Sequence, residues 1–179
     1  MPPRRRTHDQ MPAEHALLGL LAQAESSRHG YDLAREFAPG SELGEVIRLE
    51  PGMLYHHLKK LERDGWVLSR QEVVDRRPAR SVYSLTASGQ AELERWMTEP
   101  VGHTREIRLE FLVKLYLALK TDPELARRLI SEQIATLEEI EAERLATAPG
   151  EDFSSAVRAL RVAQTRTALD WLRSLKVPD

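Results

Sequence analysis

The regular spacing of leucines between Pro51 and Gly65 is the clearest hydrophobic pattern in the chain. Leu54, Leu58 and Leu61 lie at i, i+4 and i+7, which places them on one side of an α-helix. Proline suits the first helical position and glycine the residue just past the end, so the pattern predicts one short helix here. At about 100° per residue, its opposite face carries Gly52, Tyr55, His56, Lys59, Lys60 and Arg63.

Two β-favouring segments follow this helix. Residues 66–71 alternate in character, and Val82 and Tyr83 begin a second such segment. The turn between the segments contains a proline and three arginines, so the hairpin has a basic tip, formed by Arg76, Arg77 and Arg80. A helix with a cationic face followed by such a hairpin is typical of a winged helix-turn-helix, whose helix enters the major groove and whose wing contacts phosphates. The alternative is that the cationic face is only a solvated surface.

Two helices are predicted before this unit, at residues 12–23 and 30–37. Together with the helix at 51–65 they would form a three-helix core. His29 and Tyr31 start the second helix and are interpreted as packing and capping groups rather than as a catalytic pair. The expected inward positions are Leu17, Leu20, Leu21 and Ala24 in the first helix and Tyr31, Ala34 and Phe37 in the second.

The connector before the predicted helix at 51–65 contains Pro39, Gly40 and Gly44, which disfavour a long helix. Ile47 and Leu49 alternate around an arginine, and we expect them to add a short edge strand to the wing sheet.

The second half of the chain is almost purely helical in pattern. Thr86 suits the N-cap of a helix that ends before Pro100, and Asp122 followed by Pro123 is a strong helix start. Two long helices are predicted, one from Pro123 to about residue 147 and one from about residue 153 to 175. A further helix is predicted at 106–120, with inward positions Ile107, Phe111, Leu115 and Leu119.

These patterns predict a mainly α protein with three parts: a basic arm at residues 1–11, a winged helix-turn-helix domain at 12–100 and a C-terminal helical dimerisation domain at 101–179. Three helices with wide apolar stripes cannot easily bury those stripes within one chain, so we expect a symmetric homodimer. The alternative is that they form an intrachain cap on the first domain. Arg4, Arg5 and Arg6 could reach a minor groove, although a disordered tail is the simpler interpretation.

Charge supports a local rather than a global nucleic-acid site. The 179-residue chain has a net charge of −2, but residues 51–80 hold seven Lys/Arg and four Asp/Glu, a local excess of +3. The chain has no cysteine, which excludes disulfides and thiolate zinc sites. No apolar run approaches the roughly 18 residues of a membrane span. The sequence therefore favours a cytoplasmic soluble protein that does not bind a membrane.

The predicted outward side chains have different expected roles. Lys59, Lys60 and Arg63 would neutralise phosphates, and Tyr55 would bond a phosphate or stack on a sugar. His56 lies near the start of the helix, where side chains reach base edges. His57 points toward the core, and the remaining histidines lack ligand spacing, so no metal and no cofactor are expected. No phosphate loop, metal-ligand set or activated nucleophile is present in the sequence, so we do not expect an enzyme.

Three segments resemble the PadR-type bacterial transcriptional regulators: HGYDL at 29–33, GMLYHHLKKLERDGW at 52–66 and RRPARSVYSLTASG at 76–89. The order and spacing are those of the family over roughly the first hundred residues. Met53 stands where the family often has Thr or Ser, so a hydroxyl that could bond a phosphate is absent. Arg76 stands at the usual glycine of the wing, which alters the turn and adds a charge.

The resemblance implies a regulator, usually a repressor, that binds a pseudo-palindromic operator in double-stranded DNA and is in some members released by a small aromatic or hydrophobic effector. An aromatic effector pocket would be lined by Trp96, Phe111, Tyr116 and Trp171, although aromatics at helical spacing are also ordinary core residues. The alternative function is a winged-helix adaptor that binds a partner protein through its C-terminal helices. It predicts negligible, salt-insensitive DNA affinity.

Overall fold

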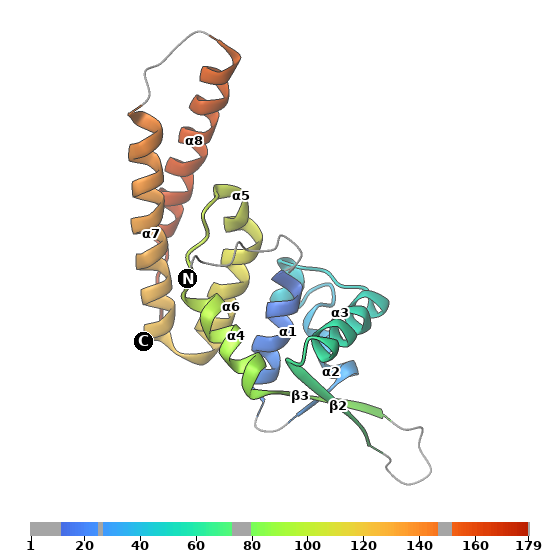
Figure 1. Cartoon of the computed structure of the whole chain (residues 1–179). Helices are drawn as coiled ribbons and strands as arrows, with labels where there is room; N and C mark the ends of the chain where they lie inside the picture. The colour runs from blue at the N-terminus through green and yellow to red at the C-terminus, as the bar shows by residue number, and fades with distance from the viewer. Residues whose placement is uncertain (1–11, 25–26, 73–79, 147–151, 179) are drawn as a thin grey trace, which may run out of the picture. The chain divides into compact units, whose positions relative to one another are not determined.

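The computed structural model describes residues 12–24, 27–72, 80–146 and 152–178 (Figure 1). The chain divides into two compact units, residues 1–96 and residues 97–179. The division falls inside one helix, α4 (Ala87–Thr98), so each unit is described by itself. The predicted functional division into an arm, a DNA-binding domain and a dimerisation domain remains a prediction.

The first unit is built on three helices: α1 (Pro12–Ala22), α2 (Gly30–Glu36) and α3 (Pro51–Arg63), with a short 3₁₀ turn, η1 (Leu43–Glu45), between the last two. Leu54, Leu58 and Leu61 of α3 are completely buried, as their spacing predicts. The residue after the helix end, Gly65, has a φ of +76°, the left-handed conformation for which glycine is suited. α1 is the most enclosed helix of this unit, because every residue from Ala13 to Leu21 is buried.

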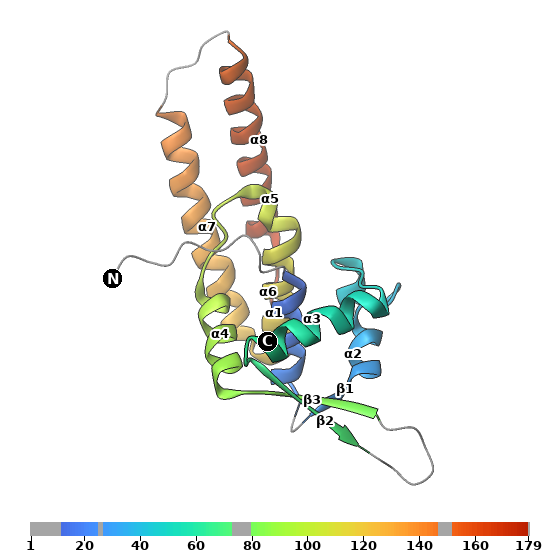
Figure 2. The ribbon, with the colours of Figure 1, turned by 45° about the vertical axis from the view of Figure 1, so that its right-hand side comes forward.

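The wing is confirmed as an antiparallel pair, β2 (Val67–Glu72) and β3 (Arg80–Leu85), in the register Val67↔Leu85 to Glu72↔Arg80. A third strand, β1 (Arg28–His29), pairs with the other edge of β3, giving the order β1-β3-β2 (Figure 2). The predicted edge strand at Ile47 and Leu49 is wrong, since this segment has no strand pairing. The true third strand is only two residues long, too short to give an alternating pattern.

The inward residues of α2 also differ from the prediction. Leu33 and Phe37 are buried, whereas Tyr31 is 68% exposed. Leu33 and Phe37 are four residues apart and therefore share one side of the helix, while Tyr31 lies about 160° from Leu33. His29 pairs with Val82 in the sheet and forms no side-chain cap on α2.

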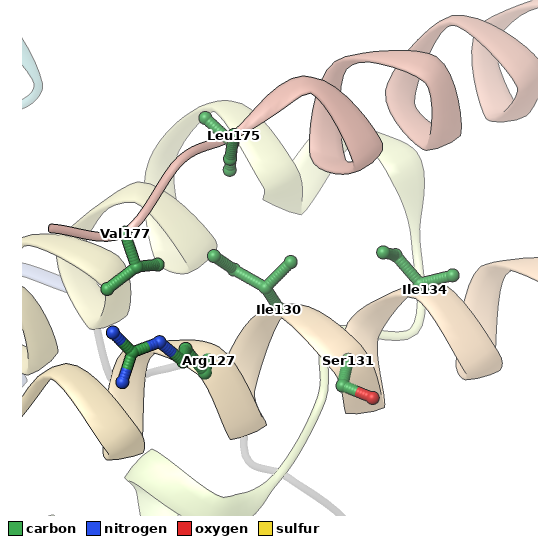
Figure 3. A pocket seen from close by; sticks show the side chains of 6 residues that line it. All are labelled: Arg127, Ile130, Ser131, Ile134, Leu175 and Val177. Carbon is green, nitrogen blue, oxygen red and sulfur yellow. The ribbon is translucent and has the colours of Figure 1, made fainter. Parts of the chain in front are cut away.

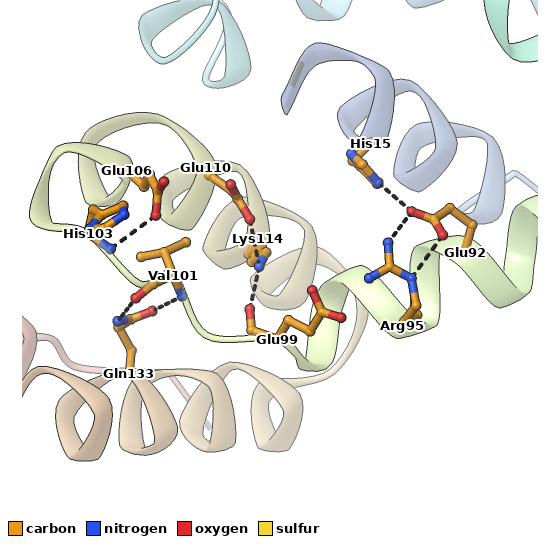
Figure 4. A network of polar contacts seen from close by, with 10 residues as sticks. All are labelled: His15, Glu92, Arg95, Glu99, Val101, His103, Glu106, Glu110, Lys114 and Gln133. Carbon is orange, nitrogen blue, oxygen red and sulfur yellow. Dashed lines mark hydrogen bonds and ion pairs between the residues drawn. The ribbon is translucent and has the colours of Figure 1, made fainter. Parts of the chain in front are cut away.

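Thr86 caps α4 as predicted: its Oγ1 accepts from the Gly89 N–H at 3.0 Å and donates to the Gly65 carbonyl at 2.8 Å. The same helix is held to α1 by Glu92 (Figure 4). Its carboxylate lies 3.0 Å from Nε2 of the buried His15 and accepts two hydrogen bonds from Arg95.

The second unit contains a helix of three sections and a helical hairpin. The first comprises α5 (Thr104–Glu106), a π-helical section η2 (Ile107–Phe111) and α6 (Leu112–Thr121). α7 (Pro123–Leu145) and α8 (Phe153–Ser174) lie side by side (Figure 1). Asp122 caps α7 as predicted, accepting from the Glu124 N–H at 2.9 Å.

In the predicted helix at 106–120, the inward positions Ile107, Phe111 and Leu115 are buried as predicted. The prediction is wrong for Leu119, which is 44% exposed. Four-residue steps advance by about 40° in an α-helix, so a stripe with this period turns away from the core. The π-helical section holds more residues per turn and reduces this drift at its start only.

Lys114 and Gln133 are polar side chains enclosed in the second unit (Figure 4). Lys114 is 0% exposed and lies 3.0 Å from the Glu110 carboxylate, while also donating to the Glu99 carbonyl. The Gln133 amide bonds both backbone groups of Val101, at 2.8 Å and 3.0 Å. Buried polar groups need such partners, and these contacts attach the segment after α4 to α6 and α7.

The predicted fold class, mainly helical with a small antiparallel wing and C-terminal helices, is therefore confirmed. Within the described ranges, no helix is both long and apolar enough to cross a membrane. The same residues contain no group of three or more His, Asp or Glu side chains suited to a metal ion.

The Glu92 contacts predict an acid-sensitive first unit. Burial alone would raise the pKa of the Glu92 carboxyl, but the hydrogen bonds from Arg95 and His15 outweigh it and lower that pKa. Because the folded-state pKa lies below the unfolded one, the stabilisation is present above the ordinary carboxyl range and is lost as the pH falls through the folded-state value.

We expect Glu92→Gln to lower the urea unfolding midpoint at neutral pH and to flatten its decline toward about pH 3. Glu94→Gln is the matched control, because Glu94 is exposed on the same helix. Parallel pH profiles for the parent and Glu92→Gln would contradict the assignment.

Candidate nucleic-acid interface

The outward face of α3 is the strongest candidate site. With the leucines buried on one side, the exposed side carries Met53, Tyr55, His56, Lys59 and Arg63. A helix of this kind fits the major groove of a duplex, where bases present acceptors, donors and the thymine methyl group. Of the six outward residues predicted from the sequence, five are exposed, and only Lys60 lies partly inside.

The Tyr55 ring is held by close contact with the start of α2. A Cβ atom added at Gly30 would lie 2.8 Å from Cε1 and 3.0 Å from Oη of Tyr55. Only a residue without a side chain leaves room for the ring in this position. The backbone of α2 therefore fixes the direction of a side chain on α3.

Lys60 is held inside the unit rather than projecting from α3. Its Nζ lies 2.8 Å from Oε1 and 3.0 Å from Oε2 of Glu14 on α1, a carboxylate that is 1% exposed. His57, buried as predicted, approaches the same Oε1 through Nδ1 at 3.1 Å. The expected phosphate contact of Lys60 is therefore corrected: its ammonium neutralises a buried carboxylate.

The wing continues the basic surface only in part. Arg70 and Arg80 are exposed on β2 and β3. Arg76 and Arg77, predicted at the tip of the wing, lie outside the described residues, as do Arg4, Arg5 and Arg6 of the N-terminal arm. A hydrogen bond of 2.5 Å from Ser69 Oγ to Glu62 Oε1 joins β2 to the end of α3.

Tyr31 and Arg35 were not predicted as site residues, yet both are exposed on α2. The Arg35 guanidinium lies 5.9 Å from the centre of the Tyr31 ring. Beside them is a polar hollow of about 500 Å³, lined by Ser27, Arg28, His29, Asp32, Arg35 and Glu36. The i, i+4 spacing of Leu33 and Phe37 was the signal in the sequence for the buried side of α2. It would have placed Tyr31 on the exposed side.

The four aromatics predicted to line an effector pocket are divided between the two units. Trp96 is buried in the first unit and stacks on His15, with ring centres 4.5 Å apart. In the second unit, Phe111 meets Trp171 edge-on at 6.0 Å, and Lys120 lies 5.7 Å from the ring centre of Tyr116. The Trp96 ring is therefore part of the first unit's core.

A different hollow of about 380 Å³ lies on α7 beneath the residues after α8 (Figure 3). Ile130 and Ile134 face Leu175 across it, and Arg127 and Val177 lie at one end, while Ser131 completes its edge. None of the four predicted aromatics lines this hollow.

A leucine-backed helix with an outward basic face, packed on two helices and followed by a small antiparallel wing, defines the winged helix-turn-helix class. The model of the family described as "Transcriptional regulator PadR-like family" matches residues 17–95, and over these residues the chain is similar to that family. The family consists of transcriptional regulators, in agreement with the prediction that the chain is not an enzyme.

Individual relatives are similar over part of the chain. The negative transcriptional regulator PadR of Bacillus subtilis is 33% identical over 105 residues, covering 58% of this chain and 54% of that protein. A transcriptional regulator of Mycobacterium tuberculosis, Rv3488, is 40% identical over 81 residues, covering 45% of this chain and 60% of that protein. The chain thus spans little more than half the length of these curated relatives.

Among solved structures, Bacillus subtilis PadR in complex with operator DNA aligns with a TM-score of 0.47 and 25% identity, over 90% of this chain and 96% of that chain. The same protein in complex with p-coumaric acid aligns with a TM-score of 0.41 and 25% identity, over 91% and 92%.

The burial of Glu14 predicts that the two adjacent lysines of α3 differ in their effect on stability. Lys60→Met removes the ammonium from a buried carboxylate and is expected to cost about 2–3 kcal/mol of unfolding free energy. Lys59→Met, on the exposed face, should change it by less than about 0.5 kcal/mol. Urea unfolding followed by circular dichroism measures both, and equal values would refute the internal placement of Lys60.

Proposed function

We propose that the protein is a dimeric, sequence-specific DNA-binding transcriptional regulator of the repressor type. The observation that carries the proposal is the exposed face of α3, in which basic and hydrogen-bonding side chains lie opposite a completely buried leucine stripe. This face belongs to the residues that match the PadR-like family. The adaptor alternative, which uses the C-terminal helices, does not account for this face of α3.

In the proposed complex, α3 enters the major groove. His56 and Met53 lie near its N-terminal end, so the imidazole contacts base edges and the thioether suits a thymine methyl group. Lys59 and Arg63 neutralise phosphates, and Tyr55 donates to a phosphate or stacks on a sugar. Arg80, with Arg76 and Arg77 of the predicted wing tip, contacts phosphates beside the groove.

A second copy of the chain is the proposed partner of the hairpin in the second unit. Large apolar side chains at the end of α7 and in the first half of α8 are open to solvent, with Leu145 53%, Phe153 84% and Leu160 58% exposed. α7 carries more acidic than basic residues and α8 the reverse, which favours pairing α7 of one copy with α8 of another. A two-fold dimer would present two α3 helices to a pseudo-palindromic operator.

Repression and release by an effector are supported by similarity. The Bacillus subtilis relative is a negative transcriptional regulator, and structures of it contain operator DNA or p-coumaric acid. We propose a small aromatic or hydrophobic effector for this chain as well. Phe111, Tyr116 and Trp171 remain the proposed aromatic contacts in the second unit.

DNA binding is tested by fluorescence anisotropy of a labelled duplex from the region upstream of the protein's own gene. A scrambled duplex is measured beside it over a range of salt concentrations. We expect salt-sensitive binding that prefers the native duplex by about a thousandfold or more. No binding to either duplex at low salt would favour the adaptor.

The phosphate contacts are tested with Lys59→Ala and Arg63→Ala. Each should reduce the slope of log Kobs against log salt by about 0.9 per lost phosphate contact, so by about 1.8 for a dimer. Arg128→Ala on α7 is the matched control, because Arg128 is exposed but belongs to the second unit. If Lys59→Ala and Arg63→Ala left the slope unchanged, as the control should, α3 would not be part of the DNA interface.

The proposed dimer surface is tested by Phe153→Glu, which places a charge on an apolar patch. Analytical ultracentrifugation should show a shift from dimer toward monomer, while circular dichroism stays unchanged. A substitution at exposed Glu132, Glu132→Gln, is the control. A dimer that survives Phe153→Glu would mean that this end of the hairpin is not the interface.

A further inference from the structure

Glu14 is the acidic side chain that reaches the candidate interface from inside the protein. It lies in the first turn of α1, a helix whose residues from Ala13 to Leu21 are all buried. A buried carboxylate needs compensating donors, and the positive end of the helix dipole supplies only part of this. The principal compensation comes from a different helix, α3.

Two side chains of α3 converge on this carboxylate. Lys60 Nζ lies within hydrogen-bonding distance of both carboxylate oxygens, at 2.8 Å and 3.0 Å, and His57 Nδ1 lies 3.1 Å from Oε1. The separation in sequence is 43 residues for His57 and 46 for Lys60, so this is a tertiary contact between α1 and α3. The Lys60 side chain is 22% exposed and therefore lies at the edge of the buried region.

The position of Lys60 on the helix would otherwise add it to the outward face. It lies about 40° around the axis from His56 and about 60° from Arg63, both of which are exposed. A lysine side chain has a flexible four-carbon stem, so its ammonium could turn outward without any change in α3. Instead it lies 2.8 Å and 3.0 Å from the two carboxylate oxygens of Glu14.

We propose that Glu14 is a positioning residue that limits the number of cations α3 presents to DNA. By holding the Lys60 ammonium inside the unit, it leaves Lys59 and Arg63 as the outward cations of the helix. This inference rests on the proposed DNA binding and adds to it a means of setting the affinity and its salt dependence.

The effect on DNA binding follows from the two kinds of contact. Phosphate contacts strengthen binding to every duplex alike, whereas base-edge contacts distinguish sequences. One ammonium withheld from each α3 therefore lowers the affinity for operator and scrambled duplex alike and leaves base readout by the N-terminal residues of the helix unchanged. The salt dependence of binding is therefore weaker than the full set of lysines and arginines on α3 would give.

The test compares the parent with Glu14→Gln, which keeps the shape of the side chain and removes its charge. His57 can still donate to the amide oxygen, but Lys60 loses its carboxylate. We expect the salt-dependence slope to become steeper by about 0.9 per protomer as the freed ammonium reaches a phosphate. The operator and the scrambled duplex should gain affinity alike, so the ratio of the two stays near the parent value.

Glu14→Gln combined with Lys60→Met is the matched control. The double variant has no ammonium to release, so its slope should return to the parent value, with circular dichroism and gel filtration confirming that both variants are folded. Glu14→Asp should restore the parent slope, because it keeps the charge. A Glu14→Gln slope equal to or shallower than the parent's overturns the proposal.

A second measurement needs no DNA and remains valid if Glu14→Gln fails to fold. Acetylation of the intact parent protein by acetic anhydride, followed by mass spectrometry, compares Lys60 with its neighbour Lys59. Slower acetylation of Lys60 supports its retention by Glu14, and equal rates overturn it. If the parent binds no DNA, the proposed function fails, while the lysine rates still report separately on the retention.

Discussion

The leucine stripe of α3 packs into the first unit and thereby determines which side of the helix faces outward. Leu54, Leu58 and Leu61 are completely buried, and burial of each is worth about 1.5–3 kcal/mol relative to exposure. Rotating α3 enough to bury a basic residue would expose this stripe, so the outward direction of His56 and Lys59 is strongly set. The wing depends on the same packing, because β2 begins two residues after the left-handed turn at Gly65 that ends α3.

A second, polar connection refines this orientation. The Glu14 carboxylate cannot remain buried without donors, and both of its donors in this contact belong to α3. Apolar packing tolerates small sliding movements, whereas the hydrogen bonds to His57 and Lys60 have narrow distance limits. The Tyr55 ring over Gly30 adds a steric limit from α2. The candidate interface is thus held from two neighbouring helices by contacts of different kinds.

The sequence predicted the features that depend on neighbouring residues. The i, i+4, i+7 leucines, the caps at Thr86 and Asp122 and the turn at Gly65 each have a local physical cause, and the structure contains all of them. It did not predict that Lys60 would face Glu14, because a helical wheel places a lysine on the polar face without reference to a buried acid 46 residues away. Periodicity also did not predict the two-residue strand β1, because it pairs with β3, which is distant in the chain.

The shortness of the exposed face of α3 limits how much sequence information one chain can read. A helix of 13 residues rises about 20 Å, and three or four of its side chains usually reach base edges. A site of about four base pairs recurs by chance roughly once in every 256 positions, whereas a genome offers on the order of a million or more competing sites. Two such helices together still leave several chance matches in a genome of that size. For a helix of this length that reads bases, the remaining discrimination must therefore come from the shape and deformability of the duplex between and beside the half-sites.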